Sequence, residues 1–415
     1  MPEVKEEPAT LPLLDRPRAG AIKYIETADS LREAIGEYSK LNGPIAVDAE
    51  RASGFKYSHR AYLIQLFRRG GPILLIDPVA ISEEDPIVFE DLADLMRDCE
   101  WVLHAASQDI PCLSELGLRP NRLFDTELAA RIANLERVGL GSSCESLLGL
   151  RLAKEHSAVD WSIRPLREDW LNYAALDVDV LLDLRDAMER LLSEQGKLIW
   201  ADQEFEHAAK FTPKPTNPDK WRAMTGLSGI KDAVVLAVAK NLWEAREALA
   251  IKLDVSPGRL VPDLSLVQAA TAKHANRAAL AADRKFAGRA SRSYLDTWWA
   301  AIEKGMSTRD LPTLRGASTG IPNHRSWPQK YPDADARLKS ARVVTLKLAE
   351  DLNIPVENLV TPDTVRQICW APQGFDETAV KAQLQNLGAR EWQIEQIAGP
   401  LAEAISSAVA DSGSE

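Results

Sequence analysis

The residues of this chain best suited to chemistry are carboxylates in three short motifs. The first is Val47-Asp48-Ala49-Glu50, which follows an apolar segment beginning at Ile45. Alternate residues of a β-strand point to the same face, so Asp48 and Glu50 are expected to project together. Two such carboxylates repel each other unless a cation joins them, which makes the pair a candidate metal site. Taken alone, however, this pattern is more often the exposed end of a strand.

The second motif is His104-Ala105-Ala106-Ser107-Gln108-Asp109, where an expected strand ends and an expected helix begins. Asp109 falls in the first helical turn, where a carboxylate also stabilises the helix dipole. His104 is equally compatible with a hydrogen-bonded histidine of the core. This motif alone therefore does not indicate a function.

The third motif is Tyr173-Ala174-Ala175-Leu176-Asp177, inside a strongly helical segment. Its spacing of four residues places the phenol and the carboxylate on one helix face, about one turn apart. A tyrosine in the core and a solvated aspartate would give the same pattern. Together, the three motifs supply four carboxylates and a tyrosine in the order DxE, D, YxxxD.

Apolar segments place these motifs in an alternation of strands and helices. The sequence predicts strands at residues 45–47, 61–67, 72–77, 101–105 and 122–124. It predicts helices at residues 30–41, 89–97, 108–116, 126–134 and 167–195. Three consecutive strands followed by strand–helix alternation indicate a mixed α/β sheet with helices packed on it.

Only helical patterns follow the proline-rich segment at residues 212–218, and a second break spans residues 311–333. The two helical blocks share a pattern of leucine, alanine and valine at one spacing. Leu249, Ala250, Leu253, Leu260 and Val261 each precede a residue of the same type by 99 positions, namely Leu348, Ala349, Leu352, Leu359 and Val360. This recurrence favours a diverged tandem repeat.

The charge of the chain is unevenly distributed. The 415 residues carry a formal charge of −11, but residues 1–209 contribute −15, residues 210–302 contribute +7 and residues 303–415 contribute −3. An acidic block suits metal ligands, and a basic block suits phosphate. The basic residues considered for a phosphate backbone are Lys220, Arg222, Lys231, Lys240, Arg246, Lys252 and Arg259.

The composition also excludes some classes of protein. The four cysteines form no CxxC pair, which favours buried thiols in a reducing compartment. The acidic, proline-rich N-terminus lacks the basic and apolar regions of a signal peptide. No segment approaches the about 18 consecutive apolar residues of a membrane span. We therefore expect a soluble, cytoplasmic protein of several domains.

With the motifs in place, the chain resembles the DEDD exonuclease superfamily, in the subgroup whose third motif carries tyrosine. The residues around the motifs are similar to ribonuclease D, in VDAERASGFKYSHRAYLIQL, HAASQDIPCL, LFDTELAARI and DWSIRPLREDWLNYAALDVDVLL. The helical blocks resemble the HRDC domain, the first in LDVSPGRLVPD and the second more weakly. The resemblance covers roughly residues 20–408.

A further DxE sequence, Asp125-Thr126-Glu127, does not fit the pattern. It follows Asp109, which breaks the order of the motifs, and it opens a helix instead of ending a central strand. Asp125 is therefore expected to be a helix N-cap.

The resemblance implies an α/β ribonuclease H-like exonuclease domain, with a mixed sheet and flanking helices, followed by two all-α HRDC-like domains. It divides the chain into a disordered tail (1–20), the DEDD 3′–5′ exonuclease domain (21–208), a linker (209–218), HRDC domain 1 (219–304), a linker (305–333), HRDC-like domain 2 (334–408) and a tail (409–415).

The resemblance also implies a two-metal reaction with Mg²⁺ or Mn²⁺, hard ions that carboxylate oxygens bind well. By position, Asp48 would bridge both ions, Glu50 and Asp177 would complete one, and Asp109 would hold the other. Tyr173 would orient the attacking water, since the pKa of a free phenol near ~10 makes it a poor base at neutral pH. The residues considered for substrate contacts are His104, Gln108, Gln65 and Arg164.

The implied reaction removes nucleotides from RNA 3′ ends and releases 5′-monophosphates, with tRNA precursors or other structured RNA as substrates. No obligate protein partner is evident. Two alternatives stay open: the same chemistry on DNA, because carboxylates do not distinguish the sugar, and a binding module that has lost catalysis. A helicase is excluded because the sequence lacks a GxxxxGK[ST] phosphate loop.

Overall fold

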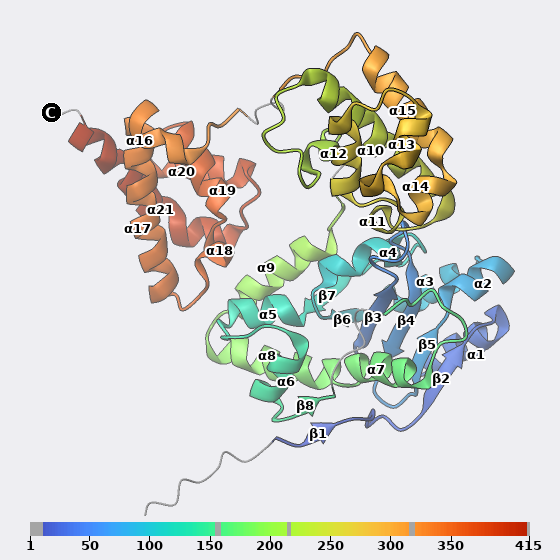
Figure 1. The fold of residues 1–415 in the computed structure, drawn as a ribbon. Coiled ribbons are helices and arrows are strands. Elements are labelled where there is room, and N and C mark those ends of the chain that lie inside the picture. The colour runs from blue at the N-terminus through green and yellow to red at the C-terminus, as the bar shows by residue number, and fades with distance from the viewer. Residues whose placement is uncertain (1–10, 154–158, 214–216, 315–319, 413–415) are drawn as a thin grey trace, which may run out of the picture.

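A mixed β-sheet forms the centre of the N-terminal half of the chain (Figure 1). The computed structural model describes residues 11–153, 159–213, 217–314 and 320–412, and within them the sheet has six strands. These strands are β2 (Ile22–Ile25), β3 (Ile45–Arg51), β4 (Ala61–Phe67), β5 (Ile73–Ile76), β6 (Glu100–Leu103) and β7 (Arg122–Asp125). Their order is β2-β5-β4-β3-β6-β7, with β4 antiparallel to both neighbours and the other pairs parallel.

Helices cover both faces of this sheet, and the alternation of side chains along β3 assigns each residue to one face. Ala46 packs into one apolar layer, whereas Ile45 and Val47 pack into the other. The helices that contribute to the Ala46 layer are α5 (Thr126–Ile132), α6 (Leu140–Leu147), α7 (Glu168–Asp179), α8 (Leu181–Glu194) and α9 (Leu198–Ala209). Those on the opposite face are α1 (Ala28–Tyr38), α2 (Pro78–Glu84), α3 (Val88–Met96) and α4 (Ile110–Ser114). Asp48 and Glu50 therefore share the face that α7 covers.

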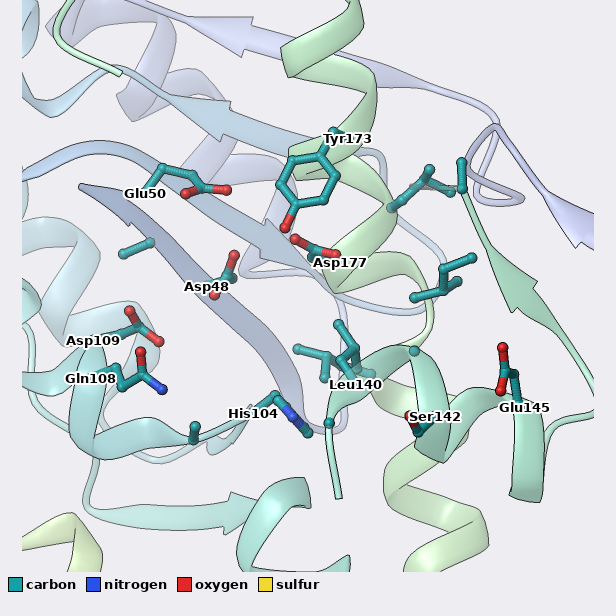
Figure 2. A pocket seen from close by; sticks show the side chains of 18 of the residues that line it. Asp48, Glu50, His104, Gln108, Asp109, Leu140, Ser142, Glu145, Tyr173 and Asp177 are labelled. Carbon is teal, nitrogen blue, oxygen red and sulfur yellow. The ribbon is translucent and has the colours of Figure 1, made fainter. Parts of the chain in front are cut away.

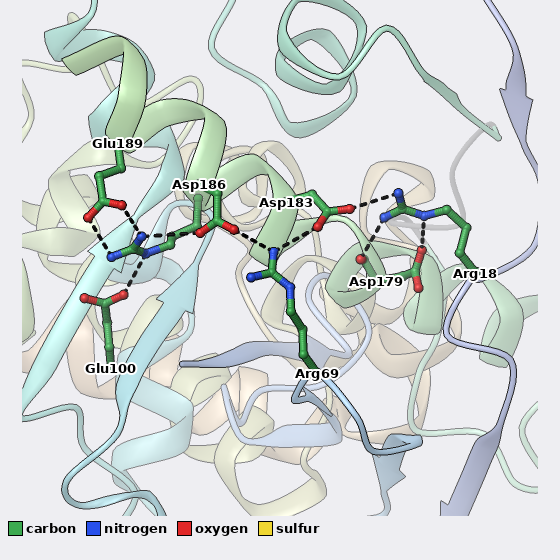
Figure 3. A network of polar contacts seen from close by, with 8 residues as sticks. Arg18, Arg69, Glu100, Asp179, Asp183, Asp186 and Glu189 are labelled. Carbon is green, nitrogen blue, oxygen red and sulfur yellow. Dashed lines mark hydrogen bonds and ion pairs between the residues drawn. The ribbon is translucent and has the colours of Figure 1, made fainter. Parts of the chain in front are cut away.

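The single helix predicted over residues 167–195 is in fact two helices, α7 and α8, which meet at Val180. The last residue of α7, Asp179, accepts hydrogen bonds of 2.9 Å from the Arg18 Nε and from the Ala19 backbone N–H. Arg18 also pairs with Asp183, which starts a chain of ion pairs along α8 through Arg69 and Asp186 (Figure 3). These contacts fix the N-terminal segment against the helices that carry the third motif.

Residues 11–20 make defined contacts, although the sequence predicts a tail over residues 1–20. The short strand β1 (Leu13–Leu14) pairs in parallel with β8 (Arg151–Leu152), and Asn172 donates a hydrogen bond to the Asp15 carbonyl. Two-residue strands carry too little pattern to be recognised in a sequence. Residues 1–10 lie outside the described part of the chain.

Two helical bodies follow the sheet domain (Figure 1). The first contains α10 (Ala233–Leu253), α11 (Pro257–Leu260), α12 (Asp263–Ala272), α13 (Arg277–Ala282), α14 (Arg289–Ser293) and α15 (Leu295–Ser307). The second contains α16 (Trp327–Lys330), α17 (Pro332–Asp351), α18 (Val356–Leu359), α19 (Pro362–Trp370), α20 (Glu377–Asn386) and α21 (Glu391–Ser412). Short 3₁₀ turns are η1 (Ala106–Gln108), η2 (Lys220–Ala223), η3 (Arg284–Phe286) and η4 (His324–Ser326). A mixed α/β domain followed by helical domains confirms the fold class predicted from the sequence.

The two helical bodies repeat one local structure at the spacing seen in the sequence. Helix α18 begins and ends 99 residues after α11, and α19 begins 99 residues after α12. The residues that follow the long helices also correspond, because Asp254 has a φ of 45° and Asn353 a φ of 50°. The recurrence of helix, left-handed residue and short helix supports the tandem repeat.

The second helical body starts earlier than the sequence predicts. Trp327 lies inside the expected linker of residues 305–333, yet it is fully buried and packs with Leu338 and Ile368. Its indole N–H donates to the Pro322 carbonyl at 3.0 Å. At the other end, α21 continues to Ser412, past the expected boundary at residue 408. Residues 315–319 lie outside the described part of the chain.

All four cysteines are free and buried, which confirms the expectation of buried thiols. Within the described residues, none of the helices combines the length and the apolar character that a bilayer span requires.

Candidate active site

The carboxylates of the first motif lie at the end of β3, on the face that α7 covers (Figure 2). A carboxylate oxygen from each of Asp48, Glu50 and Asp177 lies within 4.8 Å of the others. The period of the strand thus brings two of them together, and α7 supplies the third. This arrangement is the one that the spacing of Asp48 and Glu50 predicts.

Asp109 reaches the same region from another part of the sheet. It follows β6 through the turn η1 and immediately precedes α4. The turn begins at Ala105, which has a left-handed φ of 60°. The Asp125 carboxylate holds this turn, since it accepts hydrogen bonds from the backbone N–H groups of Ala105 and Ala106 at 3.0 and 2.8 Å. Asp109 is therefore placed by a fixed backbone, and its side chain is buried.

Asp125 caps α5 as predicted, since it also accepts hydrogen bonds from the N–H groups of Glu127 and Leu128. Its second task, which is to anchor the turn that carries Asp109, has no local sequence signal. The two tasks explain why a buried carboxylate occupies this position.

Helix α7 contributes Tyr173 and Asp177 from adjacent turns of one face. The Tyr173 hydroxyl points toward Asp177 and toward the carboxylates of β3 in Figure 2. Burial raises the pKa of Tyr173 above its ordinary value, and the charges of Asp177 and Glu50 raise it further. The phenol therefore keeps its proton and can act as a hydrogen-bond donor.

A cavity of about 980 Å³ joins the five motif residues. It is also lined by His104 and Gln108 of the second motif, by Arg51, and by the start of α6 at Gly139 to Ser142. Helix α6 and strand β8 also contribute Glu145 and Arg151 to its lining. These lining residues from α6 and β8 are separated from the motifs in sequence, so pattern alone does not identify them.

The carboxylates of this cavity are held in an environment that disfavours their charge. Burial raises the pKa of Asp48 to about 6. Burial and the neighbouring carboxylates also raise the pKa values of Glu50 and Asp109 well above their ordinary values. Crowded buried carboxylates are stabilised when a cation replaces the lost water.

The donor set fits hard divalent cations. Carboxylate oxygens are the ligands that Mg²⁺ and Mn²⁺ prefer, and the cavity leaves room for the waters that Mg²⁺ retains. Asp48, Glu50 and Asp177 form one compact group, while Asp109 lies outside this group across the cavity. The cluster is compatible with divalent metal binding.

His104 and Gln108, both expected near the substrate, line the cavity. The His104 Nδ1 lies 2.9 Å from the Thr126 hydroxyl, which in turn donates to the Leu103 carbonyl at 3.1 Å. Burial lowers the pKa of His104 to about 4, so the ring is neutral at physiological pH.

Gln65 and Arg164 do not line this cavity. Gln65 lies opposite Asp48 in the pairing of β3 with β4, and it is fully buried. The Arg164 guanidinium is occupied by contacts within the fold. It pairs with Asp77 and donates to the carbonyls of Tyr62 and Trp161.

Contacts within the fold occupy four of the basic residues considered for RNA, namely Arg222, Lys240, Arg246 and Arg259. Arg246 is buried, donates to the Val261 carbonyl and pairs with Asp263 at 2.8 Å. Arg259 donates to the Gly54 carbonyl and stacks on the Phe55 ring. Arg246 in particular is too buried to meet a nucleic acid.

Comparisons with known proteins agree with this geometry. Residues 22–193 match a family described as 3′-5′ exonuclease, and residues 235–302 match the HRDC domain. Residues 320–405 match a family described as 3′ to 5′ exonuclease C-terminal domain. The HRDC description thus falls on the first helical body, and the second body carries the description of the exonuclease C-terminal domain.

Curated relatives share part of the chain. A ribonuclease D from Acidiphilium cryptum (strain JF-5) is 30% identical over 51% of this chain and 55% of its own length. A ribonuclease D from Sphingobium indicum is 34% identical over 55% of this chain and 58% of its own length. The matched part therefore spans less than two thirds of these relatives.

Solved structures extend the likeness over nearly the whole chain. A protein from Bifidobacterium adolescentis is 35% identical, with a TM-score of 0.88, over 95% of this chain and all of its own. Escherichia coli RNase D is 24% identical, with a TM-score of 0.67, over 94% of this chain and 99% of its own, and it shares the fold. The fold and the carboxylate cavity define a protein with a 3′–5′ exonuclease domain and an HRDC domain. Residues 22–193 thus match the 3′-5′ exonuclease family, and the curated proteins that the chain resembles are named ribonuclease D.

Proposed function

We propose that the protein is a 3′–5′ exoribonuclease that hydrolyses RNA one nucleotide at a time and releases nucleoside 5′-monophosphates. The observation that carries this proposal is the meeting of Asp48, Glu50 and Asp177 within 4.8 Å, in a cavity that Asp109 and Tyr173 also line. Phosphodiester hydrolysis needs a positioned water and stabilisation of a leaving oxygen. This cavity offers ligands and donors for both.

The four carboxylates would hold two divalent cations, Mg²⁺ or Mn²⁺. Such ions, when bound, supply Lewis acidity to the attacking water and to the leaving oxygen. Asp48 would be shared between the two positions, with Glu50 and Asp177 on one side and Asp109 on the other. The surrounding turn, held by Asp125, keeps Asp109 in place for this task.

Tyr173 would orient the attacking water through its hydroxyl. Its raised pKa argues against a role as base, and its hydroxyl already points toward Asp177 and the carboxylates of β3 (Figure 2). His104 and Gln108 line the cavity where the terminal nucleotide would lie. The neutral His104 ring offers a hydrogen bond or a stacking surface without an additional charge.

We further propose that residues 21–208 act as the catalytic domain and that the helical domains at residues 219–304 and 334–408 bind the body of the RNA. The first of these carries the basic balance of the chain, which suits a phosphate backbone. Structured RNA such as tRNA precursors is the proposed substrate, and the cytoplasm is the proposed location. The name that the curated relatives share supports the choice of RNA.

A degradation assay tests the proposal. A 3′-extended tRNA and a DNA strand of matching sequence, each 5′-labelled, are incubated with the protein in Mg²⁺, Mn²⁺ or EDTA. We expect a ladder on RNA that needs metal and is lost in Asp48→Asn. Asp98→Asn, which changes an exposed aspartate outside the cavity, is the matched control and should keep full activity. Equal ladders on DNA would remove the assignment to RNA, and no ladder with any metal would contradict the catalytic function.

A further inference from the structure

A second cavity, of about 510 Å³, adjoins the catalytic cavity. The two share Arg51 and Gln108 in their linings, so these two side chains lie between the cavities. The second cavity lies between the start of α4 and the segment that follows α9, which contributes Phe211 and Pro213. Of the three sequence motifs, only the second contributes to its lining, through Ser107 and Gln108, and none of the four motif carboxylates lines it.

The charge of this second cavity differs from that of the first. Arg51, His59 and Arg119 line it, against a single carboxylate at Glu115. Arg119 and His59 are exposed, and Ser107 and Ser114 add hydroxyl groups. Cationic and hydroxyl side chains are the groups that contact a phosphate backbone.

Arg51 marks the junction between the cavities. The pairing of β3 with β4 shifts register between Glu50 and Arg51, a bulge of the kind that redirects a side chain at the end of a strand. The Arg51 guanidinium lies 3.9 Å from the Asp109 carboxylate, which is an ion pair but too long for a hydrogen bond. Among the described residues it donates no hydrogen bond, so its N–H groups are available to a ligand.

Phe211 adds an aromatic ring to this basic lining. The ring is half-buried in the wall of the cavity, beside the cationic side chains. A basic groove combined with an aromatic surface is the arrangement by which proteins bind single-stranded nucleic acid without sequence preference. A small anion would need the cations but not the ring.

We infer that the second cavity binds the single-stranded nucleotides that lie on the 5′ side of the scissile bond, with Arg51 on the phosphate at the junction. This inference rests on the proposed function, because it places the reacting 3′ nucleotide in the catalytic cavity. The strand then passes over Arg51 and Gln108 toward Arg119 and Phe211.

The dependence on substrate length tests the inference. A dinucleotide spans the scissile bond and ends at the junction, whereas a hexanucleotide also fills the second cavity. For the wild type, we expect kcat/KM to rise between these lengths. Arg119→Ala and Phe211→Ala should each lower kcat/KM several-fold for the hexanucleotide while changing that of the dinucleotide less than twofold. An equal loss at both lengths, or no loss at either, would overturn the inference.

Binding without cleavage separates this inference from the proposed function. Fluorescence anisotropy with the same labelled RNAs in EDTA reports affinity even if the protein never cuts RNA. Loss of one phosphate contact in Arg119→Ala should reduce the slope of log affinity against log salt by about 0.7 for the hexanucleotide. Arg190→Ala removes an exposed arginine of α8 that lines neither cavity, and it should match the wild type. If the protein lacks nuclease activity but its RNA binding depends on Arg119, the proposed function is refuted and the binding role of the second cavity is kept. If the salt slopes of Arg119→Ala and Arg190→Ala are equal, the binding role of the second cavity is refuted.

Discussion

Asp254 and Asn353 lie 99 residues apart, each in the left-handed conformation after a long helix, and each binds the sheet domain. Asp254 accepts hydrogen bonds from the Ser58 backbone N–H at 2.8 Å and from the Tyr62 hydroxyl. Asn353 accepts from the Asn134 amide at 2.7 Å and, through its carbonyl, from Lys197 at 2.6 Å. The two helical bodies therefore dock on the sheet domain through the same end of their repeat, at two different places.

The docking of the second body rests on Glu204 of α9. Its buried carboxylate accepts from Arg390 at 2.7 Å and from the Trp392 indole at 2.9 Å, beside the stacked rings of Trp200 and Trp392. Removal of one partner from a buried pair costs about 3–5 kcal/mol. We expect Glu204→Ala to weaken the docking by a large part of this amount, seen as faster backbone hydrogen exchange over α17 and α18.

A compensated variant separates docking from a general loss of stability. Glu204→Gln with Arg390→Met removes both charges and keeps most of the volume, so it should recover much of the protection. Exchange over the first helical body should stay unchanged in all variants. Uniformly faster exchange across both helical bodies would contradict a local role for Glu204.

Asp48→Asn should abolish the stabilisation that Mg²⁺ gives to the protein. A ligand at about 100 times its dissociation constant adds about 2.7 kcal/mol to the free energy of unfolding. We expect Mg²⁺ to raise the melting temperature of the wild type, measured by differential scanning calorimetry, and to leave that of the variant unchanged. In EDTA the variant should be at least as stable as the wild type. Burial disfavours the charge of Asp48, and the neighbouring Glu50 carboxylate repels it, so Asp48→Asn removes both effects. A Mg²⁺ response of equal size in both proteins would place the metal elsewhere.

Tyr173→Phe should lower kcat while the effect of Mg²⁺ on the melting temperature persists. The loss of a group that orients the attacking water costs about 10²-fold when the reacting atoms are misplaced. Because the pKa of Tyr173 is raised by burial and by Asp177, the phenol stays protonated. The ratio of wild-type to variant kcat should thus be constant between pH 6 and 9. A ratio that changes with pH in this range would indicate that the phenol ionises during the reaction.

Much of the site follows from local patterns, and the rest depends on contacts distant in sequence. The period of two along β3 places Asp48 and Glu50 together, and the spacing of four places Tyr173 beside Asp177. The bulge that brings Arg51 to the cavity depends on how β3 pairs with β4, which no local pattern records. The second role of Asp125 likewise depends on the turn at Ala105, twenty residues earlier in the chain.

Two parts of the fold also lack a local pattern that would predict them. Strand β2 is four residues long, and three of them are exposed, so it lacks the apolar signal of a buried strand. The proline and glycine residues around Trp327 predict a linker, although its ring fills the core of the second helical body. A segment with the composition of a linker can therefore belong to the core when one large side chain, here that of Trp327, is buried there.

Arg164→Ala should reduce stability without a specific effect on RNA affinity. Burial of Asp77 opposes the charge of its carboxylate. The hydrogen bond from Arg164 nevertheless holds the pKa of Asp77 below its ordinary value. The variant removes the ion pair of that buried carboxylate and leaves the Tyr62 carbonyl without this donor. We expect a lower melting temperature with KM for RNA changed less than twofold. Arg167→Ala, at an exposed arginine three residues later, should change neither quantity by much. A large rise in KM for Arg164→Ala alone would instead indicate that Arg164 contacts a phosphate of the RNA.

His104 should make the stability of the protein depend on pH in the mildly acidic range. Burial lowers its pKa from the ordinary 6.5 to about 4, so the unfolded chain binds the proton more readily than the folded one between these values. Its contribution is therefore complete above pH 6.5 and declines as the pH falls toward 4. His104→Gln should remove this slope, so that the stability difference between wild type and variant, measured by urea unfolding, grows by at most about 3 kcal/mol from pH 4.5 to 7. Parallel curves for the two proteins across this range would mean that His104 is protonated equally in the folded and unfolded states, and its hydrogen bond with Thr126 would then be the reason for its position.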